Sequence, residues 1–185
     1  PMKTLKPLAA IIVLTALTVF PLRADEFSSW EWLVPKPAGN YLTAVAFDGS
    51  RFIGVGDHGV ILTSTNGTNW HLAYTDTTNR LHGLTVGGGR VLAYGERATV
   101  LVSTNAAYWT PVATGSSPET GIHALAYGNE RYVLLDYAWR VFTSEGGTDN
   151  WQESPSPPQG AANDLEFGDD LFVAVGWRGL IATST

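Results

Sequence analysis

Three features of the sequence predict an all-β fold built from one repeated sheet. Apolar runs of about five residues alternate with turns rich in Gly, Asn and Asp after residue 40. No stretch of this region has the apolar spacing of about 3.6 residues that marks an amphipathic helix. The distances from Trp70 to Trp109 and from Trp109 to Trp151 are 39 and 42 residues, a nearly fixed period. The repeated phrases begin at Leu42, Leu81, Ile122 and Ala162.

Each repeat reads as four short antiparallel strands. In the first repeat the apolar runs cover residues 42–47, 52–56, 60–64 and 70–74. Asp and Gly between the first two runs, and Asn-Gly before the fourth, favour tight turns because they bond their own backbone or accept positive φ. The repeat is therefore predicted to form a four-stranded meander.

Such a meander has two apolar faces and buries one of them at best. Radial stacking of repeated sheets buries both, which is the β-propeller solution. WD40 proteins share the period, but neither the Trp-Asp dipeptide nor the Gly-His pair stands at the corresponding positions. The predicted fold is thus an all-β propeller of four-stranded antiparallel blades, about 40 residues each, with an incomplete ring.

The domain organisation follows from the repeats and from an apolar N-terminal segment. Residues 1–24 are predicted to be a signal peptide and residues 25–185 a partial propeller. The propeller would begin with a closing strand in residues 27–40. Its blades are expected at about 41–80, 81–121, 122–161 and 162–185, the last of them truncated.

The N-terminal segment has the layout of a secretory signal. Lys3 and Lys6 precede the apolar run Leu8–Phe20, and a small residue, Ala24, marks the expected cleavage point. An uncleaved membrane anchor is the alternative, although the apolar run is short for a span of about 20 residues. The protein is expected to be secreted, periplasmic or on the cell surface. Membrane contact would arise only through an uncleaved signal.

Composition excludes several kinds of site. The net charge is −6, and Lys and Arg form no cluster that could neutralise nucleic-acid phosphates, so nucleic acid is not an expected partner. The chain has no cysteine, which excludes disulfides, thiolate nucleophiles and cysteine zinc sites. No cofactor or metal is expected.

The turn before each tryptophan resembles a known motif. Ser64–Trp70 resembles the Asp box, Ser-x-Asp-x-Gly-x-x-Trp, of sialidase-like (BNR) repeats, one residue shorter. Ser103–Trp109 and Ser144–Trp151 are weaker copies. The chain is also similar to photosystem II assembly-factor propellers. In these families the motif shapes the turn between strands three and four, so the resemblance implies a structural role. The residues concerned are Ser64, Asn66, Gly67, Trp70, Ser103, Asn105, Trp109, Ser144 and Trp151.

The two ends of the repeat region do not match. Residues 27–40, with Trp30 and Trp32, resemble the end of a blade without its first three strands. An N-terminal strand of this kind often completes the last blade of a propeller, which hides sheet edges. The fourth repeat stops inside its own turn. We therefore expect the chain to be the front portion of a longer propeller.

Any binding site is expected in the loops that join the second and third strands. These loops vary between repeats while the strands do not, and they share one face of a propeller with the links between blades. Aromatic rings beside charged groups suit a carbohydrate or a peptide, whereas an ordinary solvated turn is the alternative. The candidate residues are Asp57, His58, Glu96, Arg97, Tyr137, Trp139, Arg140, Trp177 and Arg178.

No catalytic residue is predicted. His82 and His123 share one position of the repeat with Thr43 and Asn163, and they lack the neighbouring acids of a metal site. The Arg-Ile-Pro motif of sialidases is absent. The sequence therefore favours a non-catalytic, secreted binding or scaffold module for protein or carbohydrate. The alternatives are a sialidase-like glycoside hydrolase with its catalytic residues in missing blades, and a chaperone resembling photosystem assembly factors.

Overall fold

The computed structural model describes residues 30–33, 36–155 and 162–184 and confirms the all-β antiparallel fold. The chain divides into two compact units, Pro1–Trp32 and Leu33–Thr185, and the second holds all the described strands. The predicted signal, residues 1–24, lies outside the described residues. Residues 30–33 and 36–40 contain no assigned strand, so the closing strand stays a prediction. Among the residues described, no helix has the length and apolarity needed to cross a membrane.

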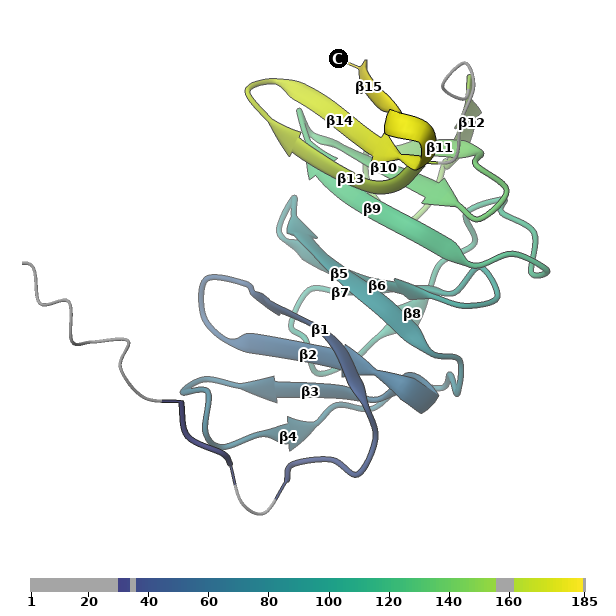
Figure 1. Cartoon of the computed structure of the whole chain (residues 1–185). Coiled ribbons are helices and arrows are strands. Elements are labelled where there is room, and N and C mark those ends of the chain that lie inside the picture. The colour runs from purple at the N-terminus through teal and green to yellow at the C-terminus, as the bar shows by residue number, and fades with distance from the viewer. Residues whose placement is uncertain (1–29, 34–35, 156–161, 185) are drawn as a thin grey trace, which may run out of the picture. The chain divides into compact units, whose positions relative to one another are not determined.

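Four sheets follow one another in the second unit, in the order of the sequence repeats (Figure 1). The first contains β1 (Leu42–Phe47), β2 (Phe52–Gly56), β3 (Ile61–Ser64) and β4 (His71–Leu72). The second contains β5 (Leu81–Gly87), β6 (Arg90–Gly95), β7 (Val100–Ser103) and β8 (Thr110–Pro111). The third contains β9 (Ile122–Gly128), β10 (Arg131–Asp136), β11 (Val141–Ser144) and β12 (Gln152–Ser154). The fourth contains β13 (Ala162–Gly168), β14 (Leu171–Gly176) and β15 (Ile181–Ser184). Short 3-10 turns, η2 (Asp57–Gly59) and η3 (Trp177–Gly179), lie in the first and fourth sheets between the second and third strands.

The hairpins that open the sheets have the predicted turn chemistry. In the first, the Asp48 carboxylate accepts hydrogen bonds from the backbone N–H groups of Ser50 and Arg51, both at 2.8 Å. In the other three sheets two consecutive residues adopt positive φ, as tight hairpins require. These pairs are Gly88-Gly89, Asn129-Glu130 and Asp169-Asp170. The last pair, Asp169-Asp170, is therefore a tight turn.

Consecutive sheets pack face to face through interfaces that we call seams. The first strands of neighbouring sheets are in contact: β1 with β5, β5 with β9, and β9 with β13. The first seam joins Ile53 and Ile61 to Val91 and Trp109, and Trp109 is only 7% exposed. In the second seam Trp151 packs against the buried side chains in the same way. The tryptophans of the second and third repeats thus pack between sheets, as expected.

The turn between the third and fourth strands is held by one serine and one asparagine. The Ser103 hydroxyl accepts hydrogen bonds from the N–H groups of Asn105 (3.3 Å) and Ala106 (2.8 Å). The Asn105 side-chain oxygen accepts hydrogen bonds from the N–H groups of Ala107 (3.0 Å) and Tyr108 (3.1 Å). Trp109 Nε1 donates to the Ala106 carbonyl at 3.2 Å. Ser64, Asn66, Gly67 and Trp70 repeat this pattern. In the first two sheets these side chains therefore hold the backbone of the turn in place.

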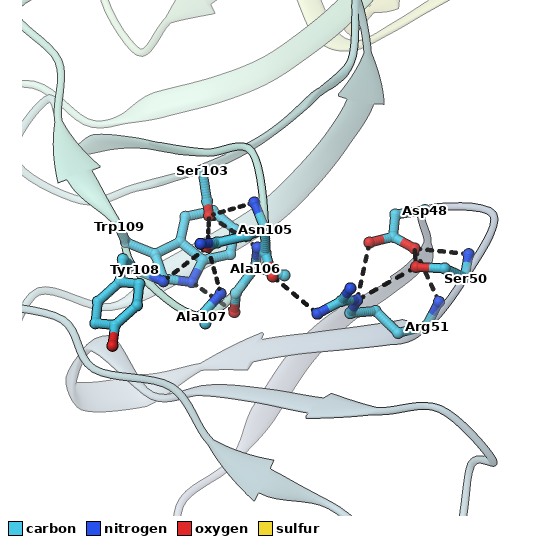
Figure 2. A network of polar contacts seen from close by, with 9 residues as sticks. All are labelled: Asp48, Ser50, Arg51, Ser103, Asn105, Ala106, Ala107, Tyr108 and Trp109. Atoms are coloured by element: carbon cyan, nitrogen blue, oxygen red, sulfur yellow. Dashed lines mark hydrogen bonds and ion pairs between the residues drawn. The ribbon is translucent and has the colours of Figure 1, made fainter.

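This turn also links neighbouring sheets. Arg51, in the first hairpin, donates a 2.8 Å hydrogen bond from Nη1 to the Asn105 carbonyl of the second sheet (Figure 2). The same guanidinium pairs with Asp48 at 3.4 Å. Arg51 therefore ties a hairpin to the turn of the following sheet.

The third copy of the turn differs and has a weaker set of bonds. One extra residue separates Ser144 from Trp151, and the Ser144 hydroxyl donates to the Asp149 carbonyl at 2.6 Å. Trp151 Nε1 is buried and has no hydrogen-bond partner in the part of the chain that the structure describes. The insertion thus removes the indole bond that the first two copies make.

Two glycine substitutions test the packing of these turns. Gly67 and Gly147 have φ of 75° and 69°, so alanine strains either by about 1 kcal/mol. Ala106 occupies the same conformation at φ 55° without displacing its surroundings. A Cβ on Gly67 would lie 3.7 Å from Phe52, whereas on Gly147 it would lie 2.7 Å from the ring of Tyr132. Gly147→Ala should therefore lower the free energy of unfolding by about 1–3 kcal/mol more than Gly67→Ala, measured by urea denaturation. Equal losses would contradict this account.

Candidate functional site: the loop face

The loops between second and third strands pack on the linkers that lead to the next sheet. Asp57 forms an ion pair with Arg80, with 3.0 Å between Oδ1 and Nε. In the second sheet the Ala98 N–H donates to the Thr120 carbonyl at 2.6 Å. Loops and linkers therefore share one end of the sheets, as predicted. We call this end the loop face.

The third loop is built differently from the other three. Its last strand residue is Asp136, where the other sheets have Gly56, Gly95 and Gly176. At Gly56 a Cβ would lie 2.0 Å from the Tyr41 carbonyl oxygen, so glycine is required there. Asp136 is 0% exposed and is the one buried carboxylate among the described residues.

Asp136 is bonded on both carboxylate oxygens. Oδ2 accepts from the Ser116 hydroxyl at 2.9 Å and from Arg140 Nε and Nη2 at 2.9 and 2.7 Å. Oδ1 accepts from the N–H groups of Ala138 (2.9 Å) and Arg140 (3.0 Å). The Arg140 guanidinium also lies 5.3 Å from the centre of the Phe142 ring. The buried charge is therefore neutralised. Its hydrogen bonds hold the loop at Ala138 and Arg140 and the linker at Ser116 in place.

The pinned loop displays two aromatic side chains. Tyr137 is 44% exposed and Trp139 is 49% exposed. Trp139 has φ 62°, a conformation that costs a bulky residue energy. Its N–H donates to the Asp136 carbonyl at 2.9 Å, which closes the turn. The Asp136 network thus fixes the strained loop backbone from which the exposed Trp139 side chain projects.

Tyr137 reaches across to the preceding sheet. Its hydroxyl lies 3.0 Å from His82 Nδ1, and its ring meets that of His123 edge-on at 4.6 Å between centres. His82 Nδ1 also lies 3.3 Å from the Ile122 carbonyl oxygen. The third loop and the inner strands of two sheets are therefore one connected cluster.

The two histidines sit at a repeated bulge. The pairing of first and second strands shifts by one residue near the start of every sheet, which leaves one unpaired residue per first strand. Where the bulge is occupied by Thr43, its hydroxyl donates to the Leu81 carbonyl of the next sheet at 2.6 Å. These polar groups are therefore bonded within the fold. The four bulge residues are Thr43, His82, His123 and Asn163.

Electrostatics at this cluster follow from burial. Burial, with the nearby His82, lowers the pKa of His123, and this outweighs the hydrogen bond to Asn163. Burial, with nearby Asp164, raises the pKa of Tyr94 to about 12, so its hydroxyl stays protonated over the ordinary pH range. Within the described ranges no three His, Asp or Glu side chains lie close enough to hold a metal ion.

The nine predicted binding residues fall into two groups. The carboxylate of Asp57 and the guanidinium of Arg140 are engaged in ion pairs inside the fold. The remaining seven are exposed on the loops, and Trp177 is 69% exposed. Those seven are His58, Glu96, Arg97, Tyr137, Trp139, Trp177 and Arg178.

Sequence reasoning missed Asp136 and its partner Ser116. The available signal was an aspartate in a repeat position that holds glycine in the other three copies. A charged residue that replaces a sterically required glycine marks a local change of backbone. Its partner in the linker could not be read from the repeat.

Comparison with solved structures identifies the class of fold that the four sheets form. No protein-family model and no curated protein matches the chain. Among solved structures, YCF48 from Cyanidioschyzon merolae matches with a TM-score of 0.65 at 17% identity, over 83% of this chain and 56% of YCF48. A structure of YCF48 bound to D1 peptide matches with a TM-score of 0.63 at 18% identity, over 80% of this chain and 51% of that one. The computationally designed protein Ika4 matches with a TM-score of 0.68 at 17% identity, over 84% of this chain and 98% of Ika4.

These likenesses show the fold: the described sheets are blades of a β-propeller. This chain spans a little over half the length of YCF48.

Removal of the Asp136 carboxylate should destabilise the protein. Asp136→Gly gives the third loop the glycine of the other sheets but leaves Arg140 without its partner. We expect a loss of about 3 kcal/mol in the free energy of unfolding by urea denaturation. The double variant Asp136→Gly, Arg140→Leu copies the Gly176–Leu180 loop and should recover about 1 kcal/mol or more. No recovery in the double variant would show that the ion pair is not the source of the loss.

Protonation of His123 should make stability depend on pH. Because the pKa of His123 is lower in the folded protein than its ordinary 6.5, the unfolded chain binds the proton first. The stability that neutral His123 allows the folded protein is fully present above about pH 6.5 and is lost as pH falls below that value. Urea midpoints at about pH 7.5 and pH 5.5 should differ less in His123→Asn, which copies the Asn163 position, than in the wild type. An unchanged difference would contradict this assignment.

Proposed function

We propose that this chain is the non-catalytic binding portion of a propeller whose loop face takes up an extended segment of a partner protein. The observation that carries the proposal is the third loop, where the Asp136 network fixes the backbone that presents the half-exposed side chains of Tyr137 and Trp139. A loop fixed in this way loses little conformational entropy when a ligand binds. Large exposed aromatic side chains are also typical of binding surfaces.

A protein partner is favoured over a carbohydrate. The similar structure of YCF48 is bound to D1 peptide, which supports a peptide ligand for a propeller of this shape. No comparison supports a sugar. Exposed charges of both signs on the neighbouring loops, at Glu96, Arg97 and Arg178, suit a peptide with polar side chains.

The finer proposals follow from the sequence. We propose that residues 1–24 direct export. We also propose that the serine–asparagine turns are Asp boxes in the BNR sense, and that a role in assembly similar to that of the photosystem II factors is the specific alternative within protein binding. The hydrogen bonds of Ser64, Asn66 and Trp70 support the Asp-box assignment.

A peptide library tests the proposal. Phage-displayed linear peptides should be enriched on the wild type, and Trp139→Ala, Trp177→Ala should reduce the affinity of the selected peptides about tenfold or more, by fluorescence anisotropy. Tyr74→Ala, Tyr108→Ala is the matched control, because these tyrosines are 68% and 74% exposed but lie outside the loops. Equal affinity in the loop variant and the control would overturn the proposal.

Two further probes separate the alternatives. Binding of a D1 peptide that is lost in the loop variant would support the assembly role, and its absence would remove that role while leaving the library result to decide on protein binding. A glycan array tests the alternative that the loop face binds a carbohydrate. Specific glycan binding lost in the loop variant, without peptide enrichment, would contradict a protein partner.

A further inference from the structure

Two hollows in the described part of the chain differ in the side chains that line them. The larger, of about 490 Å³, is a cavity in the third seam, between the third and fourth sheets, where Leu135, Phe172 and Ala182 line it. The smaller, of about 300 Å³, is lined by charged and hydroxyl side chains of the first two sheets. Its volume is at the lower end of the range of ligand pockets, roughly 300–1,000 Å³, and suits one small group.

The smaller hollow lies at the end of the sheets opposite to the loop face. Because neighbouring strands are antiparallel, the first hairpin and the turn after the third strand share one end of each sheet. The first hairpins of two sheets, residues 48–51 and 86–91, form most of the wall, and Thr104 of the second serine–asparagine turn completes it. We call this hollow the hairpin pocket. It is separate from the surface that carries Tyr137 and Trp139.

Arg51, on one side of the hairpin pocket, already has partners within the fold. Its Nη1 donates to the Asn105 carbonyl at 2.8 Å, and its Nε lies 3.4 Å from the Asp48 carboxylate (Figure 2). Burial alone would raise the pKa of Asp48, but hydrogen bonds from Ser50 and Arg51 lower it below the ordinary value. This carboxylate is therefore ionised at neutral pH, and it balances the charge of Arg51.

Arg90 has the same position in the second hairpin but lacks both kinds of partner. Glycine fills the three preceding positions, so no carboxylate corresponds to Asp48. Within the described ranges its hydrogen bond is a long one, 3.4 Å from Nη1 to the Gly88 carbonyl, and it forms no ion pair. The third turn, whose carbonyl would correspond to that of Asn105, contains one extra residue. Arg90 is thus a half-buried cation without a counter-charge.

Unused hydrogen-bond donors from three segments meet at the hairpin pocket. Besides the Arg90 guanidinium, these are the Thr104 hydroxyl and Arg51 Nη2, which make no hydrogen bond to any residue that the structure describes. Two arginines against one aspartate leave one net positive charge. A single carboxylate matches this set, because it carries one negative charge and accepts two parallel bonds from a guanidinium fork.

We propose that the hairpin pocket binds one carboxylate group on a short carbon stem, as a glutamate side chain of a peptide or a short organic acid presents it. Arg90 pairs with the carboxylate, Thr104 adds a hydroxyl bond, and the stem lies against Val86 and Val91. The charge of Asp48 in the same wall disfavours a dianionic phosphate, which would meet this carboxylate with only one positive charge to offset its two negative ones.

Titrations followed by ¹H–¹⁵N NMR spectroscopy test the proposal. The peptide acetyl-Gly-Glu-Gly-amide, added to the ¹⁵N-labelled full chain, should shift the amide signals of Ser50, Gly87 and Gly89 saturably. The same peptide with glutamine in place of glutamate should bind about tenfold more weakly or worse, because it has no charge to pair with Arg90. Sodium butyrate is the second probe. Equal affinity for butyrate and the glutamate peptide would assign the site to free acids, and tighter binding of the peptide would assign it to a peptide.

Variants of Arg90 locate the site. Arg90→Gln should raise the dissociation constant of the glutamate peptide about tenfold or more, whereas Arg90→Lys, which keeps the charge but not the fork, should raise it by less. Thr104→Val should raise it about threefold. Arg131→Gln is the matched control, because Arg131 has the same hairpin position in the third sheet, is exposed and does not line the hairpin pocket. The Arg90 variants should keep the wild-type circular dichroism spectrum, since Arg90 makes only a long bond within the described fold.

Several results would overturn the proposal. They are the absence of saturable shifts with both probes, equal binding of the glutamate and glutamine peptides, and undiminished binding by Arg90→Gln. An equal loss in Arg131→Gln would show general attraction of anions and would also overturn it, as would sodium phosphate that binds more tightly than butyrate. The loop variant Trp139→Ala, Trp177→Ala should bind the glutamate peptide as the wild type does, so this test is independent of the one for the loop face.

Discussion

The structure depends on one constraint, which is that a four-stranded sheet with two apolar faces cannot bury both of them alone. Each sheet must therefore be covered by its neighbours, and burial of apolar surface in the seams is the main stabilising contribution. Side chains such as Ile53, Ile61 and Leu92, all 0% exposed, lie in these seams. The serine–asparagine turn of the second sheet serves the same end, because it places Trp109 where the sheets meet. Positions that face the seams are consequently fixed in chemistry, and variation is confined to the ends of the strands.

This constraint explains why so much of the fold could be predicted. Alternating apolar residues, hairpin signals such as Asp48-Gly49 and the recurring tryptophans are local features, so they specify strands, turns and sheet order without knowledge of distant contacts. The hydroxyls of Ser64 and Ser103 accept hydrogen bonds from the backbone of their own turns, which are also local features. The polar groups of Thr43 and His82, on the inner strands, are likewise bonded within the fold.

The remainder could not be predicted because it depends on contacts between segments that no repeat relates. Ser116 lies in a linker, and only the fold brings its hydroxyl to the Asp136 carboxylate. The assignment of Arg140 as a binding residue likewise ignored a partner four residues away, because a sequence cannot show that this carboxylate is buried. Ala182 is an ordinary strand alanine in sequence, and only the fold shows that it lines the cavity of the third seam.

The cavity in the third seam also has a consequence for the dynamics of the chain. Strong contacts run between consecutive sheets, so the energetics are nearly one-dimensional and each seam opens with its own free energy. The third seam contains this cavity of about 490 Å³, so the apolar side chains of its two sheets are in incomplete contact. We therefore expect the third seam to open at a lower free energy than the first two, so that amide hydrogens of β13 to β15 exchange with solvent through a local event. A ligand that fills the cavity would raise the free energy of this opening without altering the rest of the fold.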